Sequence, residues 1–285
     1  MALVLFAAIL FSAGGLILLR GTPDFYQVMN QSPEDQAAAA QRAQDKLATI
    51  NNYAVEAYSS AIRTSNGTAT TAPATAPASI HVAFTDNELN ALFRNWSKLN
   101  NWKQTYEQYL IDPVLIFREN RVILAGKAKL NEINAVVSVH FEPRLTETGE
   151  LDLHLVRVQG GRLPLPRAML QKYTDQARNA LTVRLPHWQR NARIDSNGAA
   201  NNYMIAAAMG KLALQTLDDE PAAPVAFLPM VMQDVTVPVK ITDVKIDNKT
   251  LTLTAEPYTP AERMALLDEI RQPYATETAL ITDDQ

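Results

Sequence analysis

The chain has no cysteine among its 285 residues. This absence excludes disulfide bonds, thiolate zinc sites, iron–sulfur clusters and cysteine nucleophiles. Other signatures of chemistry are missing as well, because the sequence contains no H-E-x-x-H, G-x-S-x-G, P-loop or G-x-G-x-x-G pattern. We therefore expect a protein that is not an enzyme, with no catalytic residue, no metal site and no cofactor.

The four histidines stand singly in the sequence. The alternation of the strands predicts that His140 and His154 lie on the polar faces of neighbouring strands. A metal pair is one interpretation of these two side chains. Because no carboxylate accompanies them in the pattern, we favour the other, which is two solvent-facing histidines.

An excess of positive charge is also absent. Lysine and arginine number 26 against 30 aspartates and glutamates, for a formal net charge of −4. Such a chain lacks the basic surplus on which non-specific nucleic-acid binding depends, so no nucleic-acid partner is expected. Hydrophobic residues make up 47% of the chain, which is typical of a globular protein.

Charged side chains are missing altogether from residues 1–19, and Arg20 ends this apolar run. A helix of this length spans about 28 Å, close to the ~30 Å hydrocarbon core of a bilayer. A cleaved signal peptide is the alternative, but a basic n-region and an A-x-A cleavage site are both absent. Residues 1–20 are therefore predicted to form a transmembrane anchor. Arg20 lies after the span and by itself weakly favours a cytoplasmic body.

The segment after the anchor predicts a helical stalk over residues 32–63. Ser32 and Pro33 have the character of a helix start, and acidic residues follow in the first turn. The apolar positions form a narrow stripe that includes Leu47, Ile50 and Ala54, typical of a stalk or a short coiled coil that joins copies of the chain. Residues 64–79 are rich in Ala, Thr and Pro and are predicted to be a linker.

From Ile80 the apolar pattern changes to a period of two, which indicates β-strands. The connections between successive strands are too short for parallel crossovers, so an antiparallel meander is expected. Helices cover it, and the predicted order of elements is β-α-β-β-β-β-α-α-β-β-α. This α+β domain is assigned to residues 80–273, with an acidic tail at residues 274–285.

Several local features are predicted inside this domain. Thr85 and Glu88 have the spacing of a capping box at the start of a helix. Pro186 is expected to end or kink a later helix that opens after residues 163–166. A change of phase predicts a β-bulge at Thr242-Asp243, and Thr259 is expected to begin the last helix.

Four segments occur in an order that resembles a known family. They are FTDNELNALF (84–93), FEP (141–143), GELDLHL (149–155) and GRLPLPRAML (161–170). This combination is similar to the YpmS-type family of single-pass bacterial envelope proteins and, more distantly, to the tubular lipid-binding (TULIP) superfamily. The resemblance covers roughly Ile80 to Leu185. The predicted stalk, the linker and a helix rich in Ala and Met depart from the family.

The resemblance implies a TULIP-like half-barrel, in which a long curved antiparallel sheet packs on long helices around an apolar groove. It also implies an extracytoplasmic, periplasmic soluble domain, and it supplies no catalytic residue. A lipid or another long apolar molecule is then the expected ligand. The tentative groove residues are Val137, Val139, Phe141, Leu151, Leu153, Leu155, Leu170, Tyr173 and Leu181.

The same apolar residues also fit a second interpretation. They form a closed, dry core if the domain is an interaction or scaffold module of an envelope or secretion assembly, with a protein partner. The sequence alone leaves the choice between groove and core open.

A surface that touches the bilayer is a further hypothesis. Trp96 and Trp102 lie among basic residues, a combination that favours the headgroup region of a membrane. Residues 162–193, which include Arg178 and Arg184, hold seven basic residues and one acid, a composition that attracts anionic lipids. We favour a different interpretation for each group. The aromatic residues pack their helix against the sheet, and the basic residues are solvated and pair with the acidic residues of positions 256–285.

Overall fold

The computed structural model of the protein describes residues 21–26, 31–65, 79–99, 110–130, 133–165, 167–226 and 237–274. The predicted anchor, most of the predicted linker and most of the acidic tail lie outside these residues. Among the residues described, no helix combines the length and the apolar character needed to cross a membrane.

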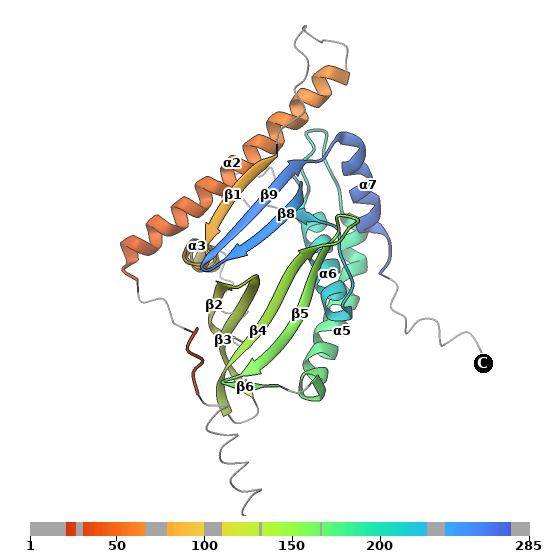
Figure 1. The fold of residues 1–285 in the computed structure, drawn as a ribbon. Helices are drawn as coiled ribbons and strands as arrows, with labels where there is room; N and C mark the ends of the chain where they lie inside the picture. Colours follow the sequence, from red (N-terminus) through yellow and green to blue (C-terminus); the bar gives the residue numbers. More distant parts are fainter. Residues whose placement is uncertain are drawn as a thin grey trace, which may run out of the picture.

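The elements follow one another in the predicted order, and two short strands, β6 and β7, are added to it (Figure 1). In chain order they are α2 (Pro33–Ser65), β1 (Ile80–Thr85), α3 (Asp86–Leu99), β2 (Ile111–Arg118), β3 (Arg121–Leu130), β4 (Ile133–Leu145), β5 (Leu151–Gly160), β6 (Leu163–Pro164), α5 (Arg167–Asn191), α6 (Asn202–Asp218), β7 (Val225–Ala226), β8 (Val239–Asp247), β9 (Thr250–Pro257) and α7 (Pro260–Arg271). The fold is therefore α+β, as the sequence predicts.

The strands form two antiparallel sheets rather than one meander. One sheet has five strands in the order β2-β3-β4-β5-β6, and the other has four in the order β1-β9-β8-β7. In the four-stranded sheet the pairing runs from Ile80 opposite Ala255 to Thr85 opposite Thr250. The predicted bulge is confirmed, because the β8–β9 register shifts between Ile241 and Asp243.

The two sheets meet at their turns. The Lys249 backbone N–H, in the turn between β8 and β9, donates to the Phe117 carbonyl of β2 at 3.0 Å. The Asn120 N–H donates to the Ile246 carbonyl at 3.2 Å, and the Asp86 N–H donates to the Lys249 carbonyl at 3.1 Å. These three bonds tie the β8–β9 turn to the β2–β3 turn and to the first residue of α3.

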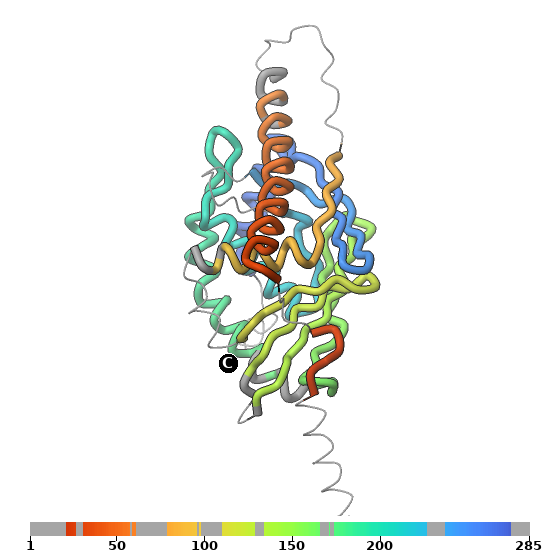
Figure 2. The backbone as a smooth tube through the Cα atoms, turned by 90° about the vertical axis from the view of Figure 1, so that its left-hand side faces the viewer, coloured from red at the N-terminus to blue at the C-terminus, as the bar shows by residue number. Residues whose placement is uncertain are grey.

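Helix α2 lies along the four-stranded sheet and against α3 (Figures 1 and 2). Its residues Ala43, Leu47, Ile50 and Ala54, spaced by four, three and four, are buried in one cluster with Phe84 and other residues of the sheet. The sequence predicts that this helix is a stalk separate from the domain. In the structure its apolar stripe packs on the sheet instead, so these four side chains are not free to pair with a second copy of the chain.

Helices α5, α6 and α7 share a second hydrophobic cluster, to which Leu185 and Met204 belong. The sequence predicts that Pro186 ends or kinks α5. The helix does not end there, since it continues to Asn191 with Pro186 inside it. The turn after the proline is held by tertiary contacts. The Gln189 side-chain amide donates to the carbonyls of Ile270 and Gln272 at 2.9 and 2.6 Å.

Candidate functional site

One face of the five-stranded sheet is closed by the segment at residues 21–26. Phe25 and Tyr26 pack there against Val114, Ile123 and Val136. The Tyr26 hydroxyl donates to the Asp112 carbonyl at 3.0 Å, and in Figure 2 the segment runs in red along the outside of the strands. We call this side the outer face. Val114, Ile123 and Val136 of this face are buried, while Ile116 at its edge is partly exposed.

The opposite, inner face also carries apolar side chains. In the sheet register Val122 lies opposite Phe141, and Leu124 lies opposite Val139. Phe141 in turn lies opposite Leu155, so these side chains share one face across three strands. We call this group the inner strip; its members are Val122, Leu124, Val137, Val139, Phe141, Leu153 and Leu155.

All members of the inner strip are partly exposed. Leu124 is the most open of them, with 39% of its surface accessible. None belongs to a hydrophobic cluster formed by the described residues. The main helical contacts of this sheet are those of α3 with β2 and of α6 with β5, at its two sides. The inner strip therefore differs from the outer face of the same sheet, where Val114, Ile123 and Val136 are buried in one cluster.

The structure brings the predicted strand residues of the groove together, while Leu181 of the predicted helix packs elsewhere. Val137, Val139, Phe141, Leu153 and Leu155 belong to the inner strip. Leu151 is on the same face but is only 7% exposed, and its backbone exchanges two hydrogen bonds with Ala222. Leu181 packs in the cluster of α5, α6 and α7. The side chains of Leu170 and Tyr173 lie outside the described residues.

The predicted membrane-surface residues do not form one described patch. Arg178 makes an ion pair with Asp218, which also accepts a hydrogen bond from the Tyr274 hydroxyl. Arg184 is exposed on α5, while the side chain of Trp96 and all of Trp102 lie outside the described residues.

The basic run pairs inside the chain with acids other than the expected ones. Arg162 pairs with Asp24 at 2.7 Å, and Arg178 pairs with Asp218. Neither acid belongs to residues 256–285, where the partners were expected. The pairing thus joins this run to the N-terminal segment and to the end of α6.

The expectation of two solvent-facing histidines is wrong for His140, which is 1% exposed. Its ring meets the Phe25 ring edge-on at 5.6 Å between centroids, and its Nε2 lies 3.1 Å from the Ser138 hydroxyl. Burial, with a smaller effect of the Arg157 guanidinium, lowers the pKa of His140 to about 4. No pattern in the sequence indicates that residues 21–26 cover this face.

The second histidine has a carboxylate partner, which the pattern did not predict. His154 Nδ1 lies 3.1 Å from Asp219 just after α6. The register places His154 opposite Glu142 and His140 opposite Arg157, so the two histidines do not form a pair. Within the described parts of the chain, no group of three or more possible ligands is arranged for a metal ion.

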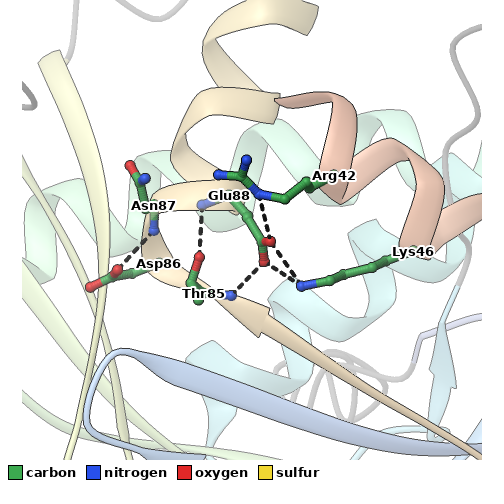
Figure 3. A network of polar contacts seen from close by, with 6 residues as sticks. All are labelled: Arg42, Lys46, Thr85, Asp86, Asn87 and Glu88. Atoms are coloured by element: carbon green, nitrogen blue, oxygen red, sulfur yellow. Dashed lines mark hydrogen bonds and ion pairs between the residues drawn. The ribbon is translucent and has the colours of Figure 1, made fainter. Parts of the chain in front are cut away.

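A polar network lies at the start of α3 (Figure 3). The predicted capping box is confirmed: the Glu88 N–H donates to the Thr85 hydroxyl at 3.2 Å, and the Thr85 N–H donates to Glu88 Oε2 at 2.9 Å. Two cations of α2 reach the same carboxylate. Lys46 Nζ lies 2.8 and 2.7 Å from its two oxygens, and Arg42 Nε lies 3.5 Å from Oε1.

This network holds Glu88 ionised in a buried position. Burial acts to raise the pKa of Glu88, but the hydrogen bonds from Lys46 and Thr85 outweigh it and bring the pKa below its usual value. The sequence identified the cap but not the cations, although Arg42 and Lys46 are spaced by four residues beside the apolar stripe of α2. One signal was available: the carboxylate of a capping glutamate can accept further hydrogen bonds from a cation beyond those of the capping box.

A cavity of about 1070 Å³ adjoins the network, between α2, α3, β2 and the β8–β9 turn. Apolar side chains such as Phe25, Val114 and Ile116 line part of it, and charged side chains line the rest. No sequence pattern marked this cavity, because its walls come from five segments that are distant in the chain.

Comparison with known proteins identifies no relative: no family model matches the chain, and neither a curated protein nor a solved structure matches it. The likeness to YpmS-type and TULIP proteins thus remains a prediction from the four segments, and function has to be inferred from the geometry.

Proposed function

We propose that the protein is a non-catalytic binding protein for a lipid or another long apolar ligand, which lies on the inner strip. The observation that carries this proposal is the partial exposure of seven apolar side chains on one face of β3, β4 and β5. The opposite face of the same sheet buries Val114, Ile123 and Val136 in a cluster. An apolar strip that stays open on a sheet is typical of a surface that is completed by a ligand.

The dimensions of the inner strip support an extended apolar ligand. Along β4, the distance from Val137 to Phe141 is about 13 Å at ~3.3 Å per residue, and three strands add a width of about 10 Å. Each methylene that leaves water on such a surface gains about 0.8 kcal/mol. An acyl chain therefore binds here without specific polar contacts.

The location of the protein is part of the same proposal. Residues 1–20 form the membrane anchor, and the body lies in the periplasm, as the resemblance implies. Residues 21–26, which follow the anchor, pack on the outer face of the sheet. This attachment leaves the inner strip on the side away from the chain segment that leads to the membrane, where a lipid can enter and leave.

A second function, an interaction or scaffold module, is favoured by a different observation. Large apolar side chains are exposed on the helices: Val183 is 80% exposed, Met209 63% and Met264 53%. Surfaces of this kind also occur where proteins associate. Under this alternative a protein partner binds the helices, and the inner strip is a part of the core.

Photo-crosslinking of the full chain distinguishes the two functions. The chain is reconstituted into phosphatidylcholine vesicles that contain a phosphatidylcholine with a diazirine near the end of one acyl chain. After irradiation, labelled peptides are mapped by mass spectrometry. We expect label on β3 and β4, near Leu124 and Val139, in addition to the label that any membrane-embedded segment acquires.

Leu124→Gln tests the inner strip without removing a buried side chain. It should lower labelling of β3 and β4 about fivefold, since roughly 1 kcal/mol of apolar contact is lost. Val183→Gln, which removes a more exposed apolar side chain on α5, is the matched control and should leave labelling unchanged. Label confined to residues 1–20 in the unaltered chain contradicts the proposed function.

A further inference from the structure

The cavity beside the Glu88 network has an unusual balance of charges. Three basic side chains, Arg42, Arg118 and Lys249, line it together with two carboxylates, Asp86 and Glu88. Glu88 is already compensated by Lys46, which contacts both of its oxygens. Arg42 also pairs with Glu88 at 3.5 Å, so Asp86 is left beside two cations, Arg118 and Lys249.

Two of these cations lack a partner within the described part of the chain. Neither the Arg118 nor the Lys249 side chain makes a hydrogen bond or an ion pair there, and both residues are exposed. Asp86 is near enough to feel both charges, yet no ion pair within 4 Å forms. Both cations are therefore available to a ligand.

The backbone brings the two cations together. The Lys249 N–H donates to the Phe117 carbonyl, so Lys249 lies beside the residue that directly precedes Arg118. Lys249 has a φ of 67°, a conformation that non-glycine residues other than Asn and Asp rarely adopt. Two exposed like charges beside one cavity repel each other, and an anion that binds between them removes this repulsion.

The backbone N–H groups at the N-terminal start of α3 are not available to bind an anion. The Asn87 N–H donates to Asp86 Oδ1 at 2.7 Å, and the Glu88 N–H donates to the Thr85 hydroxyl (Figure 3). Because these amides are occupied by the cap, an anion in this cavity is held by side chains. Arg118 and Lys249 are the two lining cations whose side chains make no hydrogen bond or ion pair with the described residues.

The other wall of the cavity is apolar. Phe25, Val114 and Ile116 line it, and the last two belong to the outer face of the sheet. We propose that this cavity binds an anionic amphiphile, with its carboxylate or phosphate group between Arg118 and Lys249 and its apolar part against Phe25 and Ile116, which are both partly exposed. The site is separate from the inner strip and does not depend on the function proposed above.

The test compares a charged probe with its neutral analogue on the full chain. A long-chain fatty acid that carries a diazirine on its alkyl chain is the charged probe, and its methyl ester is the control ligand. We expect the acid to label residues 21–26 and 111–118, and the ester to label them about tenfold less. Equal labelling of these peptides by acid and ester overturns the proposal.

Variants identify the groups that hold the anion. Arg118→Gln and Lys249→Asn remove the two charges, and asparagine tolerates the positive φ of the turn. The double variant should lose about tenfold in labelling by the acid, which corresponds to two charge-assisted contacts at a solvent-exposed site. Arg184→Gln removes one exposed positive charge on α5 and should change nothing. Unchanged labelling of the double variant overturns the proposal.

Competition separates the amphiphile from a simple anion. An unlabelled long-chain acid should displace the probe at concentrations where acetate and inorganic phosphate do not. If acetate or phosphate competes equally well, the apolar wall contributes nothing and the proposal is overturned. Leu124→Gln should leave this labelling unchanged, so the result is independent of the inner strip.

Discussion

The ammonium group of Lys46 on α2 lies 2.8 and 2.7 Å from the two carboxylate oxygens of Glu88 at the start of α3. Glu88 completes a capping box at the same time, so one side chain closes a helix end and joins two helices. The side chain of Glu88 is only 6% exposed, which makes this contact much less screened than an ordinary surface ion pair. The Lys46–Glu88 contact therefore attaches α2 to α3, next to the buried apolar stripe of α2.

Glu88→Gln is therefore expected to destabilise the fold by about 2 kcal/mol, because Lys46 loses its charged partner while part of the cap remains. Glu262→Gln in α7 is the matched control. It alters the same kind of capping box, but its Lys240 partner is 3.7 Å away and half exposed, so the expected loss is below about 1 kcal/mol. Chemical denaturation of both variants gives the two values, and equal losses would contradict the role of Lys46.

Acid should weaken the fold through Glu88. The pKa of Glu88 is lower in the folded chain than its usual 4.5. Its contribution is therefore complete above about pH 4.5 and is lost as the pH falls through the folded pKa. Unfolding free energies measured from pH 7 downward should show a fall in this range that is smaller in Glu88→Gln.

His140 gives a second pH dependence in a higher window. Its pKa is about 4 in the folded chain against an ordinary value of 6.5, so the unfolded chain binds the proton more readily. Stability should thus decrease as the pH falls from 6.5 toward 4, by about 3 kcal/mol at most. His140→Gln should remove this decrease, and His154→Gln on the next strand is the control. An unchanged slope in His140→Gln would show that another group titrates.

Ile50→Ala distinguishes a packed α2 from a separate stalk. Ile50 is 2% exposed in the cluster between α2 and the four-stranded sheet, so the variant should lose about 2–5 kcal/mol. Asn52→Ala on the exposed side of the same helix should change stability by less than about 0.5 kcal/mol. Thermal or chemical unfolding measures both, and a neutral Ile50→Ala would favour the stalk.

Pro186→Ala should stabilise the protein by about 1–2 kcal/mol. Pro186 lies inside α5 and is exposed, and alanine restores the backbone N–H that a proline removes from a helix. Arg184→Ala, at another exposed position of α5, should have little effect. A loss of stability in Pro186→Ala would mean that the packing of Gln189 against the end of α7 requires the proline.

Local signals in the sequence predicted the elements well. The capping box at Thr85, the start of the last helix at Thr259 and the bulge between Ile241 and Asp243 are all present in the structure. Each depends on residues close together in the chain, where spacing alone defines the geometry. The alternation of Val137, Val139 and Phe141 likewise placed these residues on one face.

The errors arise where distant segments meet. The stripe on α2 has the spacing of a coiled coil, but the sequence does not show that its partner is a sheet built from residues 80–85 and 239–257. His140 is predicted to face solvent because it alternates with apolar residues and so falls on the polar face of its strand. In the structure Phe25, which precedes α2 in the chain, covers that face. The cavity with Arg118 and Lys249 has the same origin, since two turns that no local pattern relates are joined by backbone hydrogen bonds.

The pairing of β1 with β9 also determines how the chain assembles. Residues 80–85 have no strand partner until residues 250–257 join them, so more than half of the chain is interposed between the two. The five-stranded sheet, by contrast, consists of hairpins between consecutive strands and closes with little loss of loop entropy. During folding the five-stranded sheet is therefore expected to form first, while β1 and the apolar stripe of α2 stay exposed and vulnerable to aggregation until the last strand arrives.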